Sequence, residues 1–189
     1  MKQPEPKPTH KKDDTTIKKS TDLAFHYWGS INYFVRLIKS SELKAGLILS
    51  FYGIILNFVY KNVELTQEHF LGQVADYILL GSWLLCTFIS IYFSIRTFIP
   101  RIEKSYDTNV FFFGDIISKF GTINEFSETF YNTSINEKER YNQLGQQIFI
   151  NAKIAATKFK SVNKSLRYLA IGLILLLIIV LNYVITPLV

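Results

Sequence analysis

The sequence predicts an all-α integral membrane protein with about three transmembrane helices, an N-terminal amphipathic helix, and a helical cytoplasmic segment between the second and third spans. Residues 77–95 and 168–189 are uncharged over 19 and 22 residues. At about 1.5 Å per residue these stretches reach roughly 28 and 33 Å as helices, which matches a hydrocarbon core of about 30 Å. A third run, residues 45–60, contains Asn57, but its tyrosine and lysine borders are typical of a membrane interface.

The amount of apolar sequence favours lipid over a protein interior. Hydrophobic residues make up 49% of the 189 residues, which is more than a soluble domain of this length usually carries. The competing interpretation is that the three runs are buried core helices of a soluble protein. Such a core needs amphipathic helices to cover three runs that are apolar on every face, and this chain has too little polar helix for that.

The chain before the first run divides into a tail and a helix. Residues 1–20 are polar and rich in lysine and proline, so they are no signal peptide, and we expect a disordered basic tail. Residues 21–42 carry an apolar stripe at helical spacing, which predicts an amphipathic helix. Its aromatic face either lies on the membrane surface or packs on the cytoplasmic segment. The stripe consists of Ala24, Tyr27, Trp28, Ile31, Phe34, Val35 and Ile38.

Residues 43–98 are expected to form a transmembrane hairpin whose two helices pack tightly through small residues. Such residues stand four apart in both spans, as two pairs in the first and as a continuous series in the second, and residues at this spacing share a helix face and allow close approach. The pattern has two interpretations, which are packing within one chain, or oligomerisation or a path through the bilayer. Its members are Gly46, Ser50, Gly53 and Asn57 in the first span, and Ser82, Cys86, Ser90 and Ser94 in the second.

Residues 99–165 form the predicted cytoplasmic helical segment, which begins with a compact apolar run leading into Asp115. Asp115 either caps a following helix, because aspartate accepts backbone N–H bonds at helix starts, or binds a ligand. Further on, Ser134 and Glu137 have the spacing of a capping box, and apolar residues then recur every three or four positions. This pattern predicts one long helix that runs into the C-terminal transmembrane helix, residues 166–189.

The long helix also has a basic face with Lys153, Lys158, Lys160 and Lys164. A face of this kind is most often solvated or turned toward lipid headgroups. The sharper alternative is a basic pocket for a phosphate group.

The distribution of lysine and arginine predicts the topology. Residues 1–44 carry nine of these residues and residues 99–165 carry nine, whereas residues 61–76 carry one and none follows Arg167. The positive-inside rule then places the amino terminus and the 99–165 segment in the cytoplasm, with the 61–76 loop and the carboxyl terminus outside.

Several function classes find no support in the sequence. The net charge of +6 is not gathered in a basic groove with aromatic platforms, so we expect no nucleic-acid partner. The single cysteine, Cys86, lies in an apolar run and cannot build a disulfide framework or a thiolate metal site. Glycine-rich phosphate loops, nucleophile elbows and metal-binding histidine pairs are missing. We therefore expect a protein that is not an enzyme, with no catalytic residue, metal or cofactor.

Three short segments resemble the transmembrane effectors of Pycsar, a bacterial antiphage defence in which a cyclase makes a cyclic pyrimidine nucleotide. They are Glu42-Leu43-Lys44-Ala45 at the first span, Phe112-Phe113-Gly114-Asp115-Ile116 after the second, and Gln146-Gln147-Ile148 in the long helix. The resemblance covers roughly residues 40–187, and the Phe-Phe-Gly-Asp-Ile segment carries most of it.

The resemblance implies a multi-pass protein of the bacterial inner membrane that responds to cyclic CMP or cyclic UMP from a partner cyclase. Such an effector, acting as a homo-oligomer in contact with lipid, damages the membrane and stops growth or kills the host. No β-rich nucleotide-binding domain is present, so a site has to be built from the helical segment, in one subunit or between subunits. Asp115, Lys153 and Lys158 are the first candidates for ligand binding. The alternative function is a membrane-anchored interaction or signalling module without pore activity.

Overall fold

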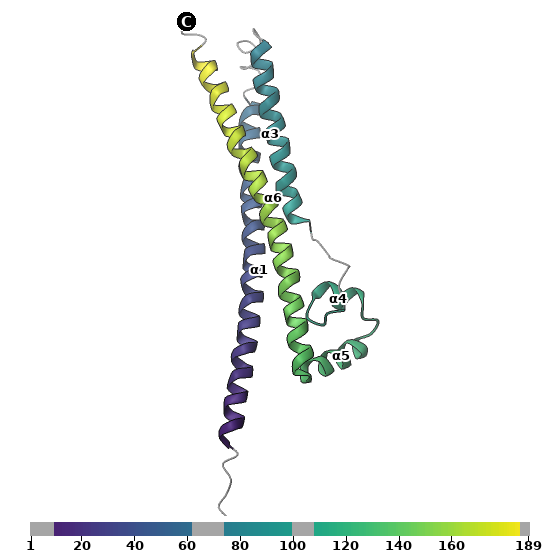
Figure 1. Cartoon of the computed structure of the whole chain (residues 1–189). Helices are drawn as coiled ribbons and strands as arrows, with labels where there is room; N and C mark the ends of the chain where they lie inside the picture. The colour runs from purple at the N-terminus through teal and green to yellow at the C-terminus, as the bar shows by residue number, and fades with distance from the viewer. Residues whose placement is uncertain (1–9, 62–73, 100–107, 186–189) are drawn as a thin grey trace, which may run out of the picture. The chain divides into compact units, whose positions relative to one another are not determined.

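The structure is a computed structural model that describes the backbone of residues 10–61, 74–99 and 108–185, and the side chains of residues 21–61, 74–99 and 108–182. Over these ranges the chain is helical and contains no strand, which confirms the predicted all-α class. Figure 1 shows the helices, which are α1 (His10–Lys61), α3 (Val74–Phe98), α4 (Phe113–Ser118), α5 (Ile123–Ile135) and α6 (Glu137–Ile185).

Three of these helices are long and apolar enough to cross a membrane, as predicted. Their qualifying parts are Thr21–Lys61 in α1, Val74–Phe98 in α3 and Glu137–Asn182 in α6. Each of the three predicted spans falls on one of these helices, and α6 contains the third span as far as Ile185. Most of the expected outside loop, residues 62–73, lies outside the described residues.

α1 is one continuous helix, so the predicted boundary between the amphipathic helix (21–42) and the first span is not a break in the backbone. None of the five prolines of the chain falls within the described helices, so no proline removes a backbone donor from α1. α1 begins at His10, inside the segment predicted as a disordered tail, of which residues 1–9 lie outside the described residues. α6 also runs without a break, as predicted for the long helix.

The described helices group into two units, and both α1 and α6 contribute to each. The first unit takes α1 as far as Val35, all of α4 and α5, and α6 as far as Lys153. The second unit takes α1 from Arg36, all of α3, and α6 from Ile154.

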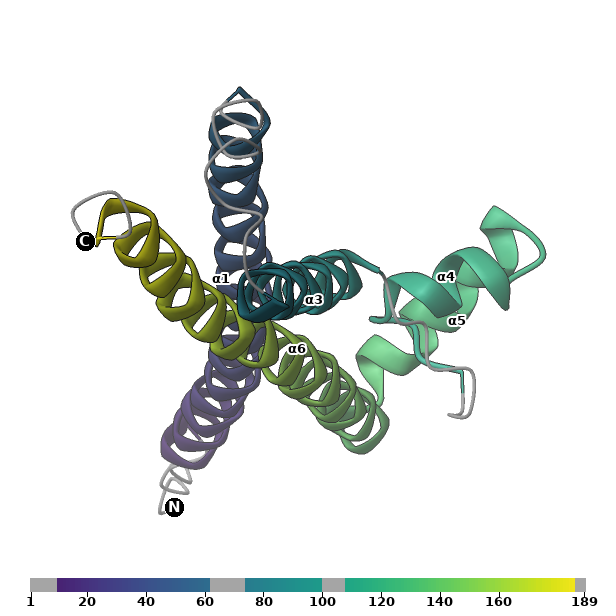
Figure 2. The same ribbon diagram turned by 90° about the horizontal axis from the view of Figure 1, so that it is seen from above.

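The second unit packs three helices around two small apolar clusters. In the first cluster Tyr52 of α1 and Val162 of α6 are buried, and Ile91 of α3 packs against them. In the second, Trp83 of α3 packs with Ile179 of α6. Figure 2 shows the three helices crossing near the centre of the view. The apolar faces of all three predicted spans therefore contribute to these two clusters.

Contacts at the two ends of the second unit give the directions of its helices. At one end Lys158 of α6 bonds to Glu42 of α1 and to the backbone of Thr97 in α3. At the other end the Asn182 side chain of α6 donates to the Asp76 carboxylate of α3, at 2.9 Å. α1 and α6 thus run in the same direction and α3 runs against them, which is the arrangement that three consecutive spans require.

The outward faces of the second unit are lined with large apolar side chains. A continuous apolar surface is costly in water, whereas the hydrocarbon of a bilayer covers it without cost. The exposed residues include Leu47, Ile54 and Phe58 on α1, Ile78, Leu85 and Phe88 on α3, and Ile171, Ile174, Leu177 and Leu181 on α6. This surface agrees with a multi-pass membrane protein.

The first unit has its own core, built where α1 and α6 pack together. Ile31 of α1 is buried against Tyr141 and Leu144 of α6, and Tyr27 and Phe111 pack against this cluster. The aromatic face of the amphipathic segment therefore packs on the long helix, which was one of its two expected positions.

Two helix starts in the first unit are capped by side chains. α5 begins after Thr122, whose hydroxyl accepts the Glu125 N–H at 3.2 Å, while the Glu125 carboxylate accepts the Gly121 N–H at 3.0 Å. α6 begins after Asn136, whose side chain accepts the Glu139 N–H at 3.2 Å. The capping box predicted from Ser134 was wrong, because α5 continues to Ile135 and places Ser134 inside its last turn.

Candidate functional site

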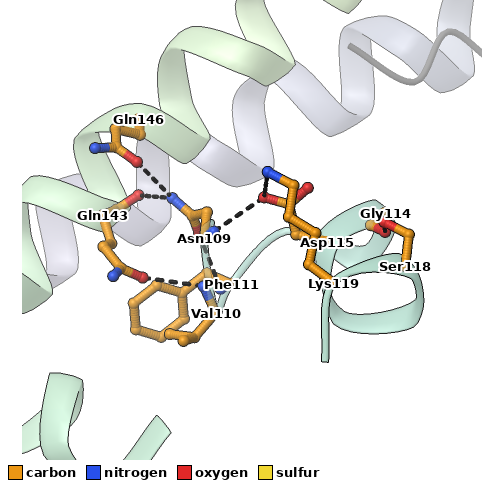
Figure 3. Close-up of polar contacts among 9 residues, drawn as sticks. All are labelled: Asn109, Val110, Phe111, Gly114, Asp115, Ser118, Lys119, Gln143 and Gln146. Carbon is orange, nitrogen blue, oxygen red and sulfur yellow. Dashed lines mark hydrogen bonds and ion pairs between the residues drawn. The ribbon is translucent and has the colours of Figure 1, made fainter. Parts of the chain in front are cut away.

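Asn109 anchors the Phe-Phe-Gly-Asp-Ile segment to α6 in the first unit. It is fully buried, and its Nδ2 donates to the carbonyl of Gln143 at 2.7 Å and to Oε1 of Gln146 at 3.3 Å. Its own Oδ1 accepts the N–H of Phe111 at 2.9 Å, and the Gln143 Oε1 accepts the N–H of Val110 at 3.0 Å. Figure 3 shows that these side chains bridge α6 and the segment that precedes α4. The contacts fix the segment on two consecutive turns of α6.

Asp115 completes this network from the other side. The residue is 4% exposed, and its Oδ2 accepts the N–H of Asn109 at 2.9 Å and a bond from Nζ of Lys119 at 3.4 Å (Figure 3). The helix-cap interpretation of Asp115 was wrong, because α4 starts at Phe113 without a side-chain cap and Asp115 lies within its first turn. A buried carboxylate that accepts a backbone N–H holds the loop in place.

A hollow of about 530 Å³ lies in the first unit between α1 and the first turns of α6. The rings of Tyr27 and Tyr141 meet in it with centroids 5.3 Å apart, and the Arg140 guanidinium lies 4.8 Å from the centroid of Tyr141. The hollow is lined by Tyr27 of α1 and by Lys138, Tyr141, Asn142, Gly145, Gln146, Phe149 and Ile150 of α6. Because Asn109 bonds to the Gln146 side chain, the network described above also positions one wall of the hollow.

The second unit contains a buried ion pair close to the start of its spans. Lys158 Nζ donates to Oε1 of Glu42 at 2.6 Å and to the carbonyl of Thr97 at 2.7 Å. The Lys158 side chain is 8% exposed and that of Glu42 is 35% exposed. One ammonium group thus joins all three helices.

A serine cluster lies deeper in the same unit and consists of Ser90, Ser94 and Ser165, all fully buried. The Ser165 hydroxyl lies 2.7 Å from that of Ser94 and 3.0 Å from that of Ser90, and it donates to the Ser90 carbonyl at 2.8 Å. Ser90 in turn donates to the Ser165 carbonyl at 2.8 Å. These reciprocal bonds join α3 to α6.

A family model described as the Pycsar effector protein domain matches residues 26–185, which cover most of both units and all of the groups above. The chain belongs to the Pycsar effector family. Comparison with curated proteins found no match, and comparison with solved structures also found none. The family is not one of enzymes, and membership implies a cyclic nucleotide signal from a cyclase partner.

The three predicted ligand residues of this Pycsar effector do not lie together in one unit. Asp115 belongs to the first unit and is committed to the Asn109 network. Lys153 is exposed on α6 at the end of the first unit, and Lys158 belongs to the second unit, where it bonds to Glu42. Among the side chains that the structure describes, no group of three or more His, Cys, Asp or Glu could hold a metal ion.

The predicted span-packing residues of the effector divide between inner and outer faces. Ser90 is buried, Ser82 and Cys86 are half-buried, and a side-chain Cβ at Gly46 would lie 3.7 Å from the Phe98 ring of α3. Ser50, Gly53 and Asn57 are exposed, and Gly53 has no neighbour within contact distance of such a Cβ. The predicted hairpin packing thus extends to Gly46, whereas the serines of α3 bond to α6.

Sequence reasoning gave no role to Asn109, Gln143 and Ser165 in this effector, and it named Gln146 only within the Gln146-Gln147-Ile148 resemblance. The sequence held a usable signal for Gln143 and Ser165. Both lie on the buried stripe of α6, Gln143 next to Leu144 and Ser165 three residues after Val162. A polar residue at a position that helical periodicity assigns to the core must find a hydrogen-bond partner. Asn109 carried no such signal, since it lies in a loop.

Proposed function

We propose that this protein is the membrane effector of an antiphage system, activated by a cyclic pyrimidine nucleotide and impairing the bacterial inner membrane. The observation that carries the proposal is the family match over residues 26–185, because the matched region contains all three apolar helices together with the polar first unit. The inclusion of the membrane helices in the matched region supports a part for them in the function.

The charge distribution supports an orientation with the amino terminus in the cytoplasm. Cations gather at the end of the second unit where Lys158 binds Glu42, since Lys44 lies over the Phe159 ring at 5.8 Å and Lys164 over the Phe93 ring at 5.0 Å. The opposite end carries the Asp76 and Asn182 pair. A cytoplasmic location of the cationic end satisfies the positive-inside rule and puts the first unit where a nucleotide cyclase acts.

Signal transfer to the membrane follows from helix continuity. α1 and α6 contribute to both units without a break, so a ligand that changes their packing in the first unit also acts on the same two helices in the second. A ligand shifts such an equilibrium only by binding one arrangement more tightly than the other. The activated arrangement is the one that binds the nucleotide better.

A homo-oligomer is the active form in this proposal, because the interior of one three-helix unit is filled by its own side chains. Ser50, Gly53 and Asn57 form an exposed face of α1 that is small and polar. A primary amide that faces lipid is costly, and pairing with a second copy satisfies it. This face therefore suits contact between subunits.

An exchange of the membrane helices distinguishes an effector from the alternative, a membrane-anchored interaction module. In a chimera, residues 45–60, 77–95 and 168–185 are replaced by unrelated apolar helices of equal length, and the chimera is expressed with an active pyrimidine nucleotide cyclase. We expect the natural chain to depolarise the inner membrane and arrest growth, and the chimera to do neither.

The control for this exchange is a cyclase with an inactivated catalytic site, with which neither chain should act. Nucleotide binding by the purified chimera shows that its first unit has folded. An inserted chimera that still arrests growth would favour the interaction module, because an anchor survives the exchange of its spans.

A further inference from the structure

Two rows of α6 side chains line the hollow between α1 and α6, one of them polar and the other aromatic. Lys138, Asn142 and Gln146 are spaced four residues apart and form a polar row. Beside it, Tyr141 and Phe149 stand four residues on either side of Gly145. Residues at this spacing share one helix face, so the two rows run side by side along the hollow.

The Tyr27 ring of α1 lies over Gly145, between the two rings of the aromatic row. A side-chain Cβ at this position would lie 3.8 Å from the Tyr27 ring of α1, so any longer side chain would fill the hollow. The cavity of about 530 Å³ falls within the usual size of small-molecule sites, roughly 300–1,000 Å³. The Phe149 side chain is 58% exposed, so a flat ring can stack on it from the hollow.

The polar row offers the remaining contacts that a pyrimidine nucleotide needs. Aromatic rings stack on any base, and primary amides supply both a donor and an acceptor for the edge of a base. The Gln146 oxygen accepts a bond from Asn109, which directs its NH₂ group as a donor toward a pyrimidine carbonyl. The Lys138 ammonium supplies a cation for the single negative charge of a cyclic phosphate.

We infer that this hollow is the binding site of the activating cyclic pyrimidine nucleotide, an inference that rests on the proposed function. The base stacks on Phe149, its edge bonds to Asn142 and Gln146, and the phosphate faces Lys138. The Asn142 amide serves either cytosine or uracil, because it can donate to a carbonyl or accept from an amino group.

The site also explains why the Phe-Phe-Gly-Asp-Ile segment is anchored to α6. Asp115 holds the N–H of Asn109, and Asn109 holds the Gln146 side chain that lines the hollow. Asp115 is a positioning residue, because it acts on the ligand only through Asn109 and Gln146.

Equilibrium titration of the full-length protein in detergent with cyclic UMP and cyclic CMP tests the site. The variants are Phe149→Ala and Lys138→Glu, whose side chains are exposed, so neither change opens the core. The matched controls are Tyr131→Ala on α5, an aromatic residue that is 64% exposed, and Lys160→Glu on α6. We expect each site variant to weaken binding about tenfold or more, the loss typical of one stacked or charged contact, and each control to bind as the natural chain does.

The possible results separate this inference from the proposed function. Binding by the natural chain together with undiminished binding by both site variants would overturn the site and leave nucleotide activation standing. Failure of the natural chain to bind either nucleotide would overturn both. A further variant, Lys153→Glu, tests the other basic face of α6. If Lys153→Glu lost binding and Lys138→Glu did not, the phosphate would bind at that other face, and the proposed site would be wrong. Thermal unfolding curves that match the natural chain show that each variant is folded.

Discussion

Glu42→Leu is expected to destabilise the second unit by about 3 kcal/mol. The substitution removes the carboxylate that accepts from Lys158 and leaves an ammonium that is 8% exposed without an anion. Breaking a buried pair at one partner costs about 3–5 kcal/mol, and the lower end applies because water reaches the Glu42 carboxylate. The free energy of unfolding, measured by denaturant titration in mixed micelles, reports the change.

The double variant Glu42→Leu/Lys158→Met is the control for this prediction. It removes both charges and restores apolar contact between α1 and α6, so most of the lost stability should return. Equal stability of the single and double variants would show that the charge left on Lys158 is not the cause. No loss in the single variant would show that the ion pair does not join the three helices in the membrane.

Ser165→Leu is expected to cost a similar amount, about 3 kcal/mol, through a different mechanism. Ser165 is fully buried and bonds to Ser90 and Ser94, so a leucine both overfills the space between α3 and α6 and leaves two hydroxyls without this partner. Overpacking costs about 1–3 kcal/mol, and an unsatisfied buried polar group costs a comparable amount. The midpoint of thermal unfolding in detergent measures the loss.

Two further substitutions separate the steric part from the hydrogen bonds. Ser165→Ala removes the hydroxyl without adding volume, so its cost should be about 1 kcal/mol. Ser50→Leu adds the same leucine to the exposed face of α1 and should leave the monomer unchanged. If Ser165→Leu were no worse than Ser50→Leu, α3 and α6 would not pack through the serine cluster.

The three apolar helices were predictable because the signal is local. A run that is uncharged for about 20 residues and apolar on every face fixes its own helical structure and its environment, without reference to a partner. The absence of proline inside α1 and α6 is an equally local signal, and both helices are continuous.

The packing partner of the serines was not predictable, since spacing identifies a face and not what covers it. The buried line on α3 runs through Trp83, Thr87, Ser90, Ser94 and Thr97, alternating steps of four and three residues. A strict four-residue repeat drifts around a helix with 3.6 residues per turn, so the Ser82 and Cys86 end of the predicted face turns away from this line.

The site residues of the first unit were least accessible to sequence reasoning. Asn109 and Gln143 lie 34 positions apart and meet only through the fold. The Ser134 capping signal failed for a similar reason, since Asn136 offered a competing cap two residues later and α5 extended past Ser134. The apolar run that leads into Asp115 marked this residue in the sequence, but its partner Asn109 came from the structure.

Release of dye from liposomes that contain the purified protein tests the central claim most directly. We expect cyclic UMP or cyclic CMP to release the dye, a cyclic purine nucleotide to release none, and protein without nucleotide to leave the liposomes intact. Intact liposomes after addition of either pyrimidine nucleotide, with the protein inserted and folded, would contradict direct activation of a membrane-impairing effector.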